Sequence, residues 1–198
     1  MAFTLATISE ETKSNNNKQV SKVADAVADA SLNGARGNSG SILAQFFVGF
    51  ADGIGSFRRL TPERFSKAIN TAKNYSYDAL SEPKEGTILS VISDWAYSVN
   101  NIYEKHDDFV IILDFAFEQA KESLRKTPEK LAILKTAGVV DARAQGFVDF
   151  LEGINHFIKQ GKKDDVDTST IAEPVDNFEV EMTDEFRYCT ECLVAGND

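Results

Sequence analysis

Helical periodicity is the strongest pattern in the first 160 residues of this 198-residue chain. Apolar side chains recur every three or four positions in one segment after another, and the alternation typical of a half-buried strand is nearly absent before residue 175. This spacing places the apolar side chains of each segment on one face of a helix. The pattern predicts an all-α fold, built as a bundle or closed ring of antiparallel amphipathic helices with short connections.

About seven helices follow from this periodicity and from the residues that flank it. Thr61 precedes Pro62, which is the usual order of an N-cap and a proline in the first helical turn. Thr87, the acidic pair at 107–108 and Asp141 are the other candidate helix starts. We expect helices over 18–31, 40–52, 62–80, 88–105 and 109–124, a short one from 127, and a last one over 143–160.

The apolar faces of these helices predict the core. Trp95 and most of the 14 phenylalanines are assigned to it, because large aromatic side chains are mostly buried. In the last helix, the spacing assigns Phe147, Phe150 and Phe157 to the buried face.

Charge is distributed unevenly along the chain, whose net charge is −10. Residues 164–198 carry eleven acidic side chains and one basic side chain, so residues 1–163 are formally neutral. No basic face is evident, which argues against a nucleic-acid partner. No membrane span or signal peptide is evident, and two cysteines cannot form a disulfide framework, so a cytoplasmic protein is expected.

The chain divides into three parts by composition. Residues 1–160 form the predicted helical domain, and residues 161–177 are polar and charged, as in a linker. Residues 178–198 contain FEVEM and YCTECLV, which predict one or two short strands at the start of an incomplete second domain. The Cys-x-x-C in this part has no second cysteine pair, so no zinc site is expected.

A glycine-rich stretch, GARGNSGSILAQF at 34–46, runs directly into an apolar helix. Backbone N–H groups at such a turn, together with the helix dipole, favour a phosphate group, and Asn38 and Ser39 suit this role. The spacing matches neither a Walker A loop nor a dinucleotide-binding fingerprint. The alternative is a turn whose glycines permit close helix packing, and the spacing alone favours that alternative.

Two further blocks occur downstream, EPKEGTILSV at 82–91 and AGVVDARAQGF at 137–147. Taken in order with the glycine-rich stretch, and with YCTE near the end, they resemble the nucleotide-binding L-type domain of dihydroxyacetone kinases (DhaL). The resemblance is closest to the version that begins bacterial fatty acid kinase A-subunits (FakA). It covers roughly residues 1–160, with 178–198 as the start of the next domain.

The resemblance implies a ring of helices, eight in the family, that binds ATP or ADP at one end. It places the phosphates at Asn38 and Ser39 and an apolar base contact at Ile88. Where the family usually has glycine this chain has Arg143 and Ala144, and an arginine could obstruct the pocket or could reach a phosphate or the adenine face. The nucleotide site implied in full is Asn38, Ser39, Ala79, Ile88, Asp141, Ala142 and Arg143.

The family also uses two Mg²⁺ ions, held by three aspartates in a short run that precedes its first conserved helix. In this resemblance Met1 corresponds to the last residue of that run, so the chain is expected to be truncated ahead of it. Asp25 and Asp29 share a helix face and are interpreted as solvated surface. No catalytic or metal-binding residue is therefore assigned.

Two functions remain open at this point. In the first, the chain is the ATP-binding domain of a phosphotransferase of the glycerone kinase or fatty acid kinase type. Such a domain transfers the γ-phosphate to a substrate held by a partner protein that binds dihydroxyacetone or a fatty acid. In the second, it is a truncated or degenerate helical module without catalysis.

Overall fold

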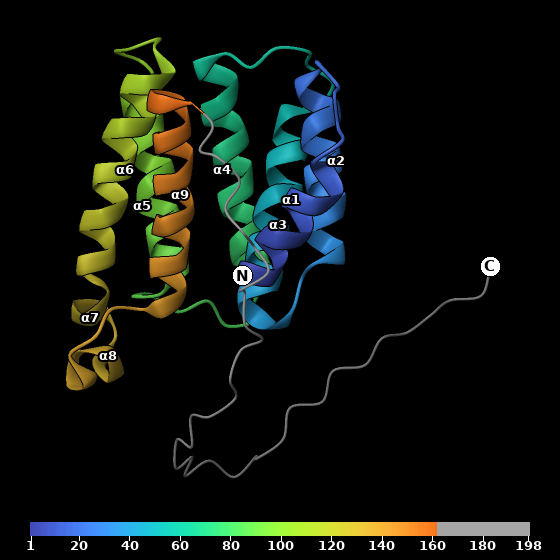
Figure 1. Cartoon of the computed structure of the whole chain (residues 1–198). Helices are drawn as coiled ribbons and strands as arrows, with labels where there is room; N and C mark the ends of the chain where they lie inside the picture. Colours follow the sequence, from blue (N-terminus) through green and yellow to red (C-terminus); the bar gives the residue numbers. More distant parts are fainter. Residues whose placement is uncertain (162–198) are drawn as a thin grey trace, which may run out of the picture.

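The computed structural model describes residues 1–161 of the chain, and every regular element in this part is a helix. The all-α prediction is confirmed (Figure 1). The predicted strands and second domain lie outside the described residues, as does almost all of the predicted linker. The helices are α1 (Ala2–Thr12), α2 (Val20–Asn33), α3 (Gly37–Ile54), α4 (Pro62–Asp78), α5 (Ile88–Ile102), α6 (Phe109–Arg125), α7 (Thr127–Lys130), α8 (Ala132–Ala137) and α9 (Ala142–Gln160).

Local capping signals located the helix starts well. Thr61 accepts a hydrogen bond from the Arg64 N–H, and Asp108 accepts one from the Val110 N–H. Thr87 and Asp141 cap α5 and α9 in the same way. These four side chains satisfy N–H groups that have no partner inside the helix.

The structure differs from the prediction mainly in three places, beyond shifts of up to three residues at other helix ends. Helix α1 was not predicted, because its apolar periodicity is weak. Helix α3 begins at Gly37 rather than at residue 40, so part of the glycine-rich stretch is its first turn. The short segment after residue 127 is divided into α7 and α8, because the backbone is extended at Leu131.

The long helices alternate in direction. In Figure 1, α2, α4 and α6 run toward one end of the molecule, and α3, α5 and α9 run toward the other. Each helix from α1 to α6 packs on the next, and α9 packs on α5 and α6. Closure of this arrangement into a ring stays a prediction.

An aromatic cluster fills the centre of the core. The rings of Phe46, Phe65 and Phe147 surround Trp95 at centroid distances of 5.9 to 6.3 Å. Trp95 is 3% exposed, as its assignment to the core predicts. The assignment of Phe157 to the core is wrong, because its side chain is 59% exposed. It lies ten residues after Phe147, about 80° around the helix, beyond the face that α5 and α6 cover.

Close helix packing uses glycine within the predicted turn, where a Cβ atom on Gly34 would lie 2.6 Å from the Thr7 Cβ atom of α1, and again further along α3. A Cβ atom on Gly53 would lie 2.6 Å from the Ala68 Cα atom, so only glycine lets α3 approach α4 this closely. Asp25 and Asp29 are exposed on α2, as interpreted from the sequence. Within residues 1–161, no helix has both the length and the hydropathy needed to cross a bilayer.

Candidate functional site

Three helices begin at the same end of the molecule. They are α3, α5 and α9, whose first residues are Gly37, Ile88 and Ala142 (Figure 1). The start of a helix carries partial positive charge, because its first N–H groups lack intrahelical acceptors and its peptide dipoles are aligned. The N–H groups of each of these first turns can therefore bind an anion locally, although α2, α4 and α6 end at the same end of the molecule and place partial negative charge there.

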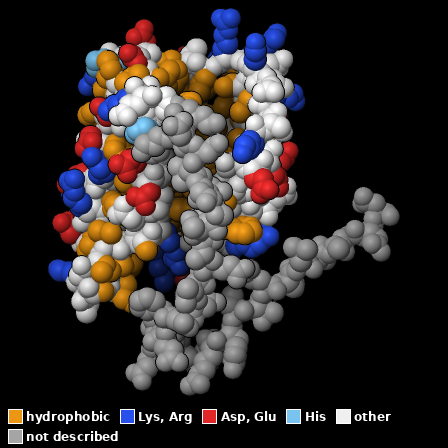
Figure 2. Space-filling view, viewed as in Figure 1, with side chains coloured by type: hydrophobic (Ala, Val, Ile, Leu, Met, Phe, Trp, Pro, Cys, Tyr) orange, Lys and Arg blue, Asp and Glu red, His pale blue; other side chains and the backbone are white. Residues whose placement is uncertain are grey.

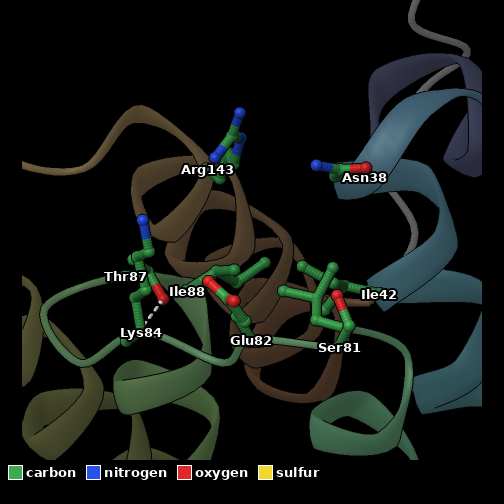
Figure 3. A pocket seen from close by; sticks show the side chains of 9 residues that line it. Asn38, Ile42, Ser81, Glu82, Lys84, Thr87, Ile88 and Arg143 are labelled. Atoms are coloured by element: carbon green, nitrogen blue, oxygen red, sulfur yellow. Dashed lines mark hydrogen bonds between the residues drawn. The ribbon is translucent and has the colours of Figure 1, made fainter. Parts of the chain in front are cut away.

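A pocket of about 330 Å³ lies between these helix starts and the connection from α4 to α5. Figure 3 shows that Asn38 and Arg143 face each other across its open side, with Glu82 below and between them. Ile42 and Ile88, which are 2% and 1% exposed, form the floor. The lining residues are Asn38, Ile42, Leu80, Ser81, Glu82, Lys84, Thr87, Ile88 and Arg143.

The first turn of α3 has no side-chain cap. Gly37 has a φ of +58°, a left-handed conformation that lets the chain turn sharply from the extended Arg36 into the helix. Nothing within 4 Å would obstruct a Cβ atom on Gly37, so its backbone conformation is the reason for glycine here. The N–H groups of this turn are thus available to an anion.

The loop before α3 is braced from two sides. The buried Thr4 hydroxyl of α1 donates a hydrogen bond of 3.1 Å to the Gly34 carbonyl. The Arg36 guanidinium donates to the Asn33 and Ala35 carbonyls at 3.0 and 2.6 Å, and it lies 5.4 Å from the centroid of the Phe3 ring. These contacts fix the loop that aims the first turn of α3 at the pocket.

The connection from α4 to α5 is fixed by its own polar contacts. The Thr87 hydroxyl donates to the Lys84 carbonyl at 2.7 Å (Figure 3). The Gly86 N–H donates to the Ser90 hydroxyl at 2.9 Å, and that hydroxyl donates to the Glu85 carboxylate at 2.5 Å. Glu85 is not among the lining residues of the pocket. Its hydrogen bond with Ser90 engages its carboxylate elsewhere.

Tyr77, at the end of α4, also contacts Glu85. Its hydroxyl donates to the carboxylate at 3.4 Å. Burial raises the pKa of the Tyr77 hydroxyl, and the Glu85 charge raises it further. Tyr77 therefore stays neutral and acts as a hydrogen-bond donor behind the pocket wall.

Asp141 is held by the short helix α7 rather than by the pocket. Its carboxylate accepts from the Ala144 N–H at 2.7 Å, and its own N–H donates to the Thr127 hydroxyl at 3.1 Å. That hydroxyl donates in turn to the Leu124 carbonyl at 2.8 Å, and Thr127 is fully buried. Thr127 thus ties the end of α6 to the start of α9 and so positions Arg143.

Three of the seven implied nucleotide residues, Asn38, Ile88 and Arg143, line the pocket. The other four adjoin it in the chain. Ser39 is half-buried in the first turn of α3 and Ala142 is exposed in the first turn of α9, whereas Ala79 is half-buried directly before the lining residues at 80–82. Arg143 is exposed at the rim, so it leaves the floor open.

Sequence reasoning did not identify six of the lining residues as site residues. Glu82, Lys84 and Thr87 lie inside the block EPKEGTILSV. The block indicated that this region is near the site, but it did not indicate which of its side chains line the pocket. Leu80 and Ser81 directly precede this block, and Ile42 carries the pattern of an ordinary core residue. Ile42 is recognised as part of the pocket floor only in the tertiary structure, where Ile42 of α3 and Ile88 of α5 line the same pocket.

The pocket rim carries two basic groups, on Lys84 and Arg143, and one acidic group, on Glu82. Within residues 1–161, no group of three or more His, Cys, Asp or Glu side chains lies close enough together to ligate a metal ion. The described residues therefore suit an anion with an apolar part better than a directly ligated metal ion.

Comparison with known proteins identifies relatives of the whole chain. It is 31% identical over 201 residues to an uncharacterized protein of Staphylococcus haemolyticus, an alignment that covers 98% of this chain and 36% of the relative. It is 31% identical over 206 residues to Protein YloV of Bacillus subtilis, covering 98% and 37%. The chain thus spans little more than a third of the length of these relatives.

The family profile described as "DAK2 domain" matches residues 1–156, which is nearly the whole helical part. This range includes all three helix starts that surround the pocket. The chain belongs to the DAK2 domain family, which consists of nucleotide-binding domains of the dihydroxyacetone kinase type.

Proposed function

We propose that the pocket binds ATP or ADP, with the phosphates at the first turn of α3 and the base on the apolar floor. The observation that carries this proposal is the meeting of three helix starts at one pocket with a charged rim and an apolar floor. Helix starts bind phosphate groups through N–H groups and the dipole together. The nucleotide-binding character of the DAK2 family supports the same ligand.

The phosphate side of the proposed site has several donors. The first turn of α3 has no side-chain cap, and Asn38 projects from it toward the pocket. Arg143 faces Asn38 from the start of α9, and Lys84 adds a second positive charge. We propose that Arg143 contacts a phosphate from the side, and its exposed position at the rim supports this role.

The base side is apolar. Ile42 and Ile88 are buried, and Leu80 completes the wall next to them. The volume of about 330 Å³ lies at the lower end of the 300–1,000 Å³ that is typical of small-molecule pockets. The open side leaves room for the phosphate groups to extend along the first turn of α3.

The described residues do not offer the set of three carboxylates through which the family holds Mg²⁺. Glu82 is the one carboxylate among the lining residues of this pocket. The role proposed for residues 1–161 is therefore to bind and orient the nucleotide. Magnesium, when present, would neutralise charge on the phosphates during transfer.

At the level of the whole protein, we propose that this domain belongs to a phosphotransferase of the glycerone kinase or fatty acid kinase type. Domains of this family work with partner subunits. The acceptor of the γ-phosphate would then be held by a partner that binds dihydroxyacetone or a fatty acid. The alternative is a truncated or degenerate helical module without catalysis, and the observation behind it is that residues 1–161 contain no group of three or more His, Cys, Asp or Glu side chains that could hold a metal ion.

Nucleotide binding is tested by thermal or urea unfolding with ADP or ATP, with and without Mg²⁺. A ligand at about 100 times its dissociation constant stabilises the folded state by about 2.7 kcal/mol. We expect Arg143→Glu to weaken binding about tenfold or more, because hydrogen bonds to charged groups contribute about 1.5–3 kcal/mol. Absence of any stabilisation at millimolar nucleotide would refute the proposal.

Arg59→Glu is the matched control for Arg143→Glu. Arg59 is also exposed, but it lies in the connection between α3 and α4, at the opposite end of α3 from the pocket. The two substitutions change the net charge equally, so a difference between them reports on the pocket and not on the overall charge. Measurement of phosphate release from Mg²⁺-ATP then separates a kinase domain from a module that binds without turnover.

A further inference from the structure

A second charged feature lies at the end of the molecule opposite the nucleotide pocket. Within residues 1–161, the side chains that line a surface hollow of about 560 Å³ are those of Lys18, Arg58, Arg59 and Arg64. We call these four residues the basic cluster. They come from the segment before α2, from the connection between α3 and α4, and from the first turn of α4. Figure 2 shows Lys and Arg side chains projecting from this end of the molecule.

The backbone around the basic cluster is tied together. The N–H groups of Val20 and Ser21, at the start of α2, donate to the carbonyls of Arg58 and Phe57 at 3.3 Å each. The Arg64 guanidinium lies 3.7 Å from the centroid of the Phe57 ring. It also donates to the Arg59 carbonyl at 3.2 Å. The backbone that carries the basic cluster is therefore held in one arrangement, and the Arg64 guanidinium is oriented by its contacts with Phe57 and Arg59.

No acidic side chain of residues 1–161 forms an ion pair with the basic cluster. Every ion pair found in this part of the chain involves other cations. Glu63 follows Thr61 in the same turn as Arg64, but its carboxylate lies 2.7 Å from the Lys67 ammonium. The four positive charges thus stand together without an ion-pair partner among the described residues, although the Glu63 carboxylate, whose pKa is lowered mainly by Lys67, also feels the Arg64 charge.

The C-terminal segment of the same chain has the complementary charge. Residues 164–198 contain eleven acidic side chains and one basic side chain. Helix α9, which leads into this segment, ends at Gln160 at the same end of the molecule as the connection between α3 and α4 (Figure 1). The first acidic residues, Asp164 and Asp165, follow only four and five positions later.

We propose that residues 164–198 dock on the basic cluster through their carboxylates. Guanidinium and carboxylate groups form paired, charge-assisted hydrogen bonds, and three of the four cations are arginines. Reach is not limiting, because an extended chain spans about 3.3–3.6 Å per residue. The docked segment leaves the nucleotide pocket open, since that pocket lies at the other end of α3.

The test uses the full chain and its own cysteines. Cys189 and Cys192 are its only two cysteines, and both lie in the acidic segment. Cys192→Ser leaves one thiol at Cys189 for a nitroxide label. Ser169→Cys, in a chain with both native cysteines replaced by serine, places a second label in the first half of the segment. Broadening of backbone amide signals by the label then reports which surface the segment contacts.

We expect the strongest broadening at residues 18–21 and 56–64. Raising the salt concentration from 0.1 to 1 M should remove most of it, because the Debye length falls from about 10 to about 3 Å. Arg58→Glu with Arg59→Glu should remove it at low salt as well. Both side chains are exposed, so the double variant should keep the dispersed amide spectrum of the folded chain.

Lys73→Glu with Lys135→Glu is the matched control, with the same change in charge outside the basic cluster and outside the ion pairs found within residues 1–161. This control should leave the broadening at residues 18–21 and 56–64 unchanged. Equal broadening at both ends of the molecule, or broadening that survives reversal of Arg58 and Arg59, would overturn the proposal. So would signal shifts in the basic cluster with inorganic pyrophosphate but no effect of either label, which would assign the cluster to a free phosphate anion.

Discussion

The two ends of the helical domain both concentrate positive charge, but they produce it in different ways. At the pocket end, three helix starts surround one pocket that has Lys84 and Arg143 at its rim, and buried hydrogen bonds through Thr127 and Thr4 hold the backbone in place. At the other end, the charge comes from four side chains, of which Lys18, Arg58 and Arg59 are exposed. The comparison distinguishes a preorganised site from an electrostatic surface.

This difference has a physical consequence for each end. Backbone N–H groups held by buried contacts lose little freedom when a ligand binds, so they favour one ligand geometry. Exposed long side chains are screened by salt and adapt to many geometries, so they favour an extended partner of opposite charge. Pairs of substitutions, one at each end of the domain, test whether the pocket end is a preorganised site and the other end an electrostatic surface.

The largest expected difference is in the unfolding free energy lost when a threonine is replaced at the pocket end, Thr127, or at the end that carries the basic cluster, Thr61. Thr127→Val removes a fully buried hydroxyl and leaves the Asp141 N–H and the Leu124 carbonyl without their partner, which should cost about 1–3 kcal/mol of unfolding free energy. Thr61→Val removes an exposed helix cap at the other end and should cost about 1 kcal/mol. Urea unfolding measures both.

Nucleotide affinity is a second measurement that distinguishes Thr127→Val from Thr61→Val. The substitution should weaken ADP binding, because Thr127 positions the start of α9, whereas Thr61→Val should leave the affinity unchanged. Equal losses of stability and affinity in the two variants would remove the distinction between the ends.

The next comparison uses the two ends of a single helix. Gly37 begins α3 with a φ of +58°, and Gly55 follows it with a φ of +56°. Alanine at either position should cost about 1–2 kcal/mol, because a left-handed conformation strains an L-residue with a Cβ atom. Only Gly37→Ala should also reduce nucleotide affinity, which calorimetric titration would show. Equal affinity in both variants would mean that the first turn of α3 does not bind the phosphates.

The smallest effect concerns the contact between α6 and α9 near the end that carries the basic cluster. Lys159 and Asn155 donate hydrogen bonds to the Asp114 carboxylate, and these bonds lower its pKa below the usual value. A carboxyl group with a lowered pKa stabilises the folded state above about pH 4, and this stabilisation is lost as the pH falls through its folded-state pKa.

Asp114→Asn should therefore cost about 1 kcal/mol or less at pH 7, since the group is near the surface. The difference from the unsubstituted chain should vanish in acid, as followed by unfolding at several pH values. Glu118→Gln is the control, because the ion pair of Glu118 within residues 1–161 is with Lys121 on the same helix. A difference that persists unchanged below pH 3 would show that packing, and not charge, explains the Asp114 effect.

Much of the fold was predictable because its signals are local. The caps at Thr61, Thr87, Asp108 and Asp141 each act within one helical turn, so the sequence shows them directly. The aromatic core around Trp95 followed from spacing in the same way. Phe157 was misassigned because spacing defines a face but not how far around the helix the neighbouring helices cover it.

The candidate site was predictable only in part. Asn38, Ile88 and Arg143 were implied by the resemblance and line one pocket, whereas Asp141, implied equally, is engaged in capping α9. Ile42 could not be identified, because nothing in its local sequence distinguishes the floor of a pocket from the core. Roles for these residues in nucleotide binding stay predictions until the titrations are made.

The basic cluster was missed for a related reason. Its members are separated by up to 46 positions in the sequence, and residues 1–163 are neutral overall, so no basic run marks it. Folding brings Lys18 beside the connection between α3 and α4, and the cluster exists only after that contact is made.

The sequence by itself determined most of the helices, four of their caps and the acidic character of the last 35 residues, because these depend on the residues themselves and on neighbours within a few turns. It also indicated the family, through three blocks that occur in order along the chain. The tertiary structure decided which helix ends meet, and with that the pocket and the basic cluster. The reason is physical: a dipole or a charge acts across space, so its function depends on which segments folding places side by side.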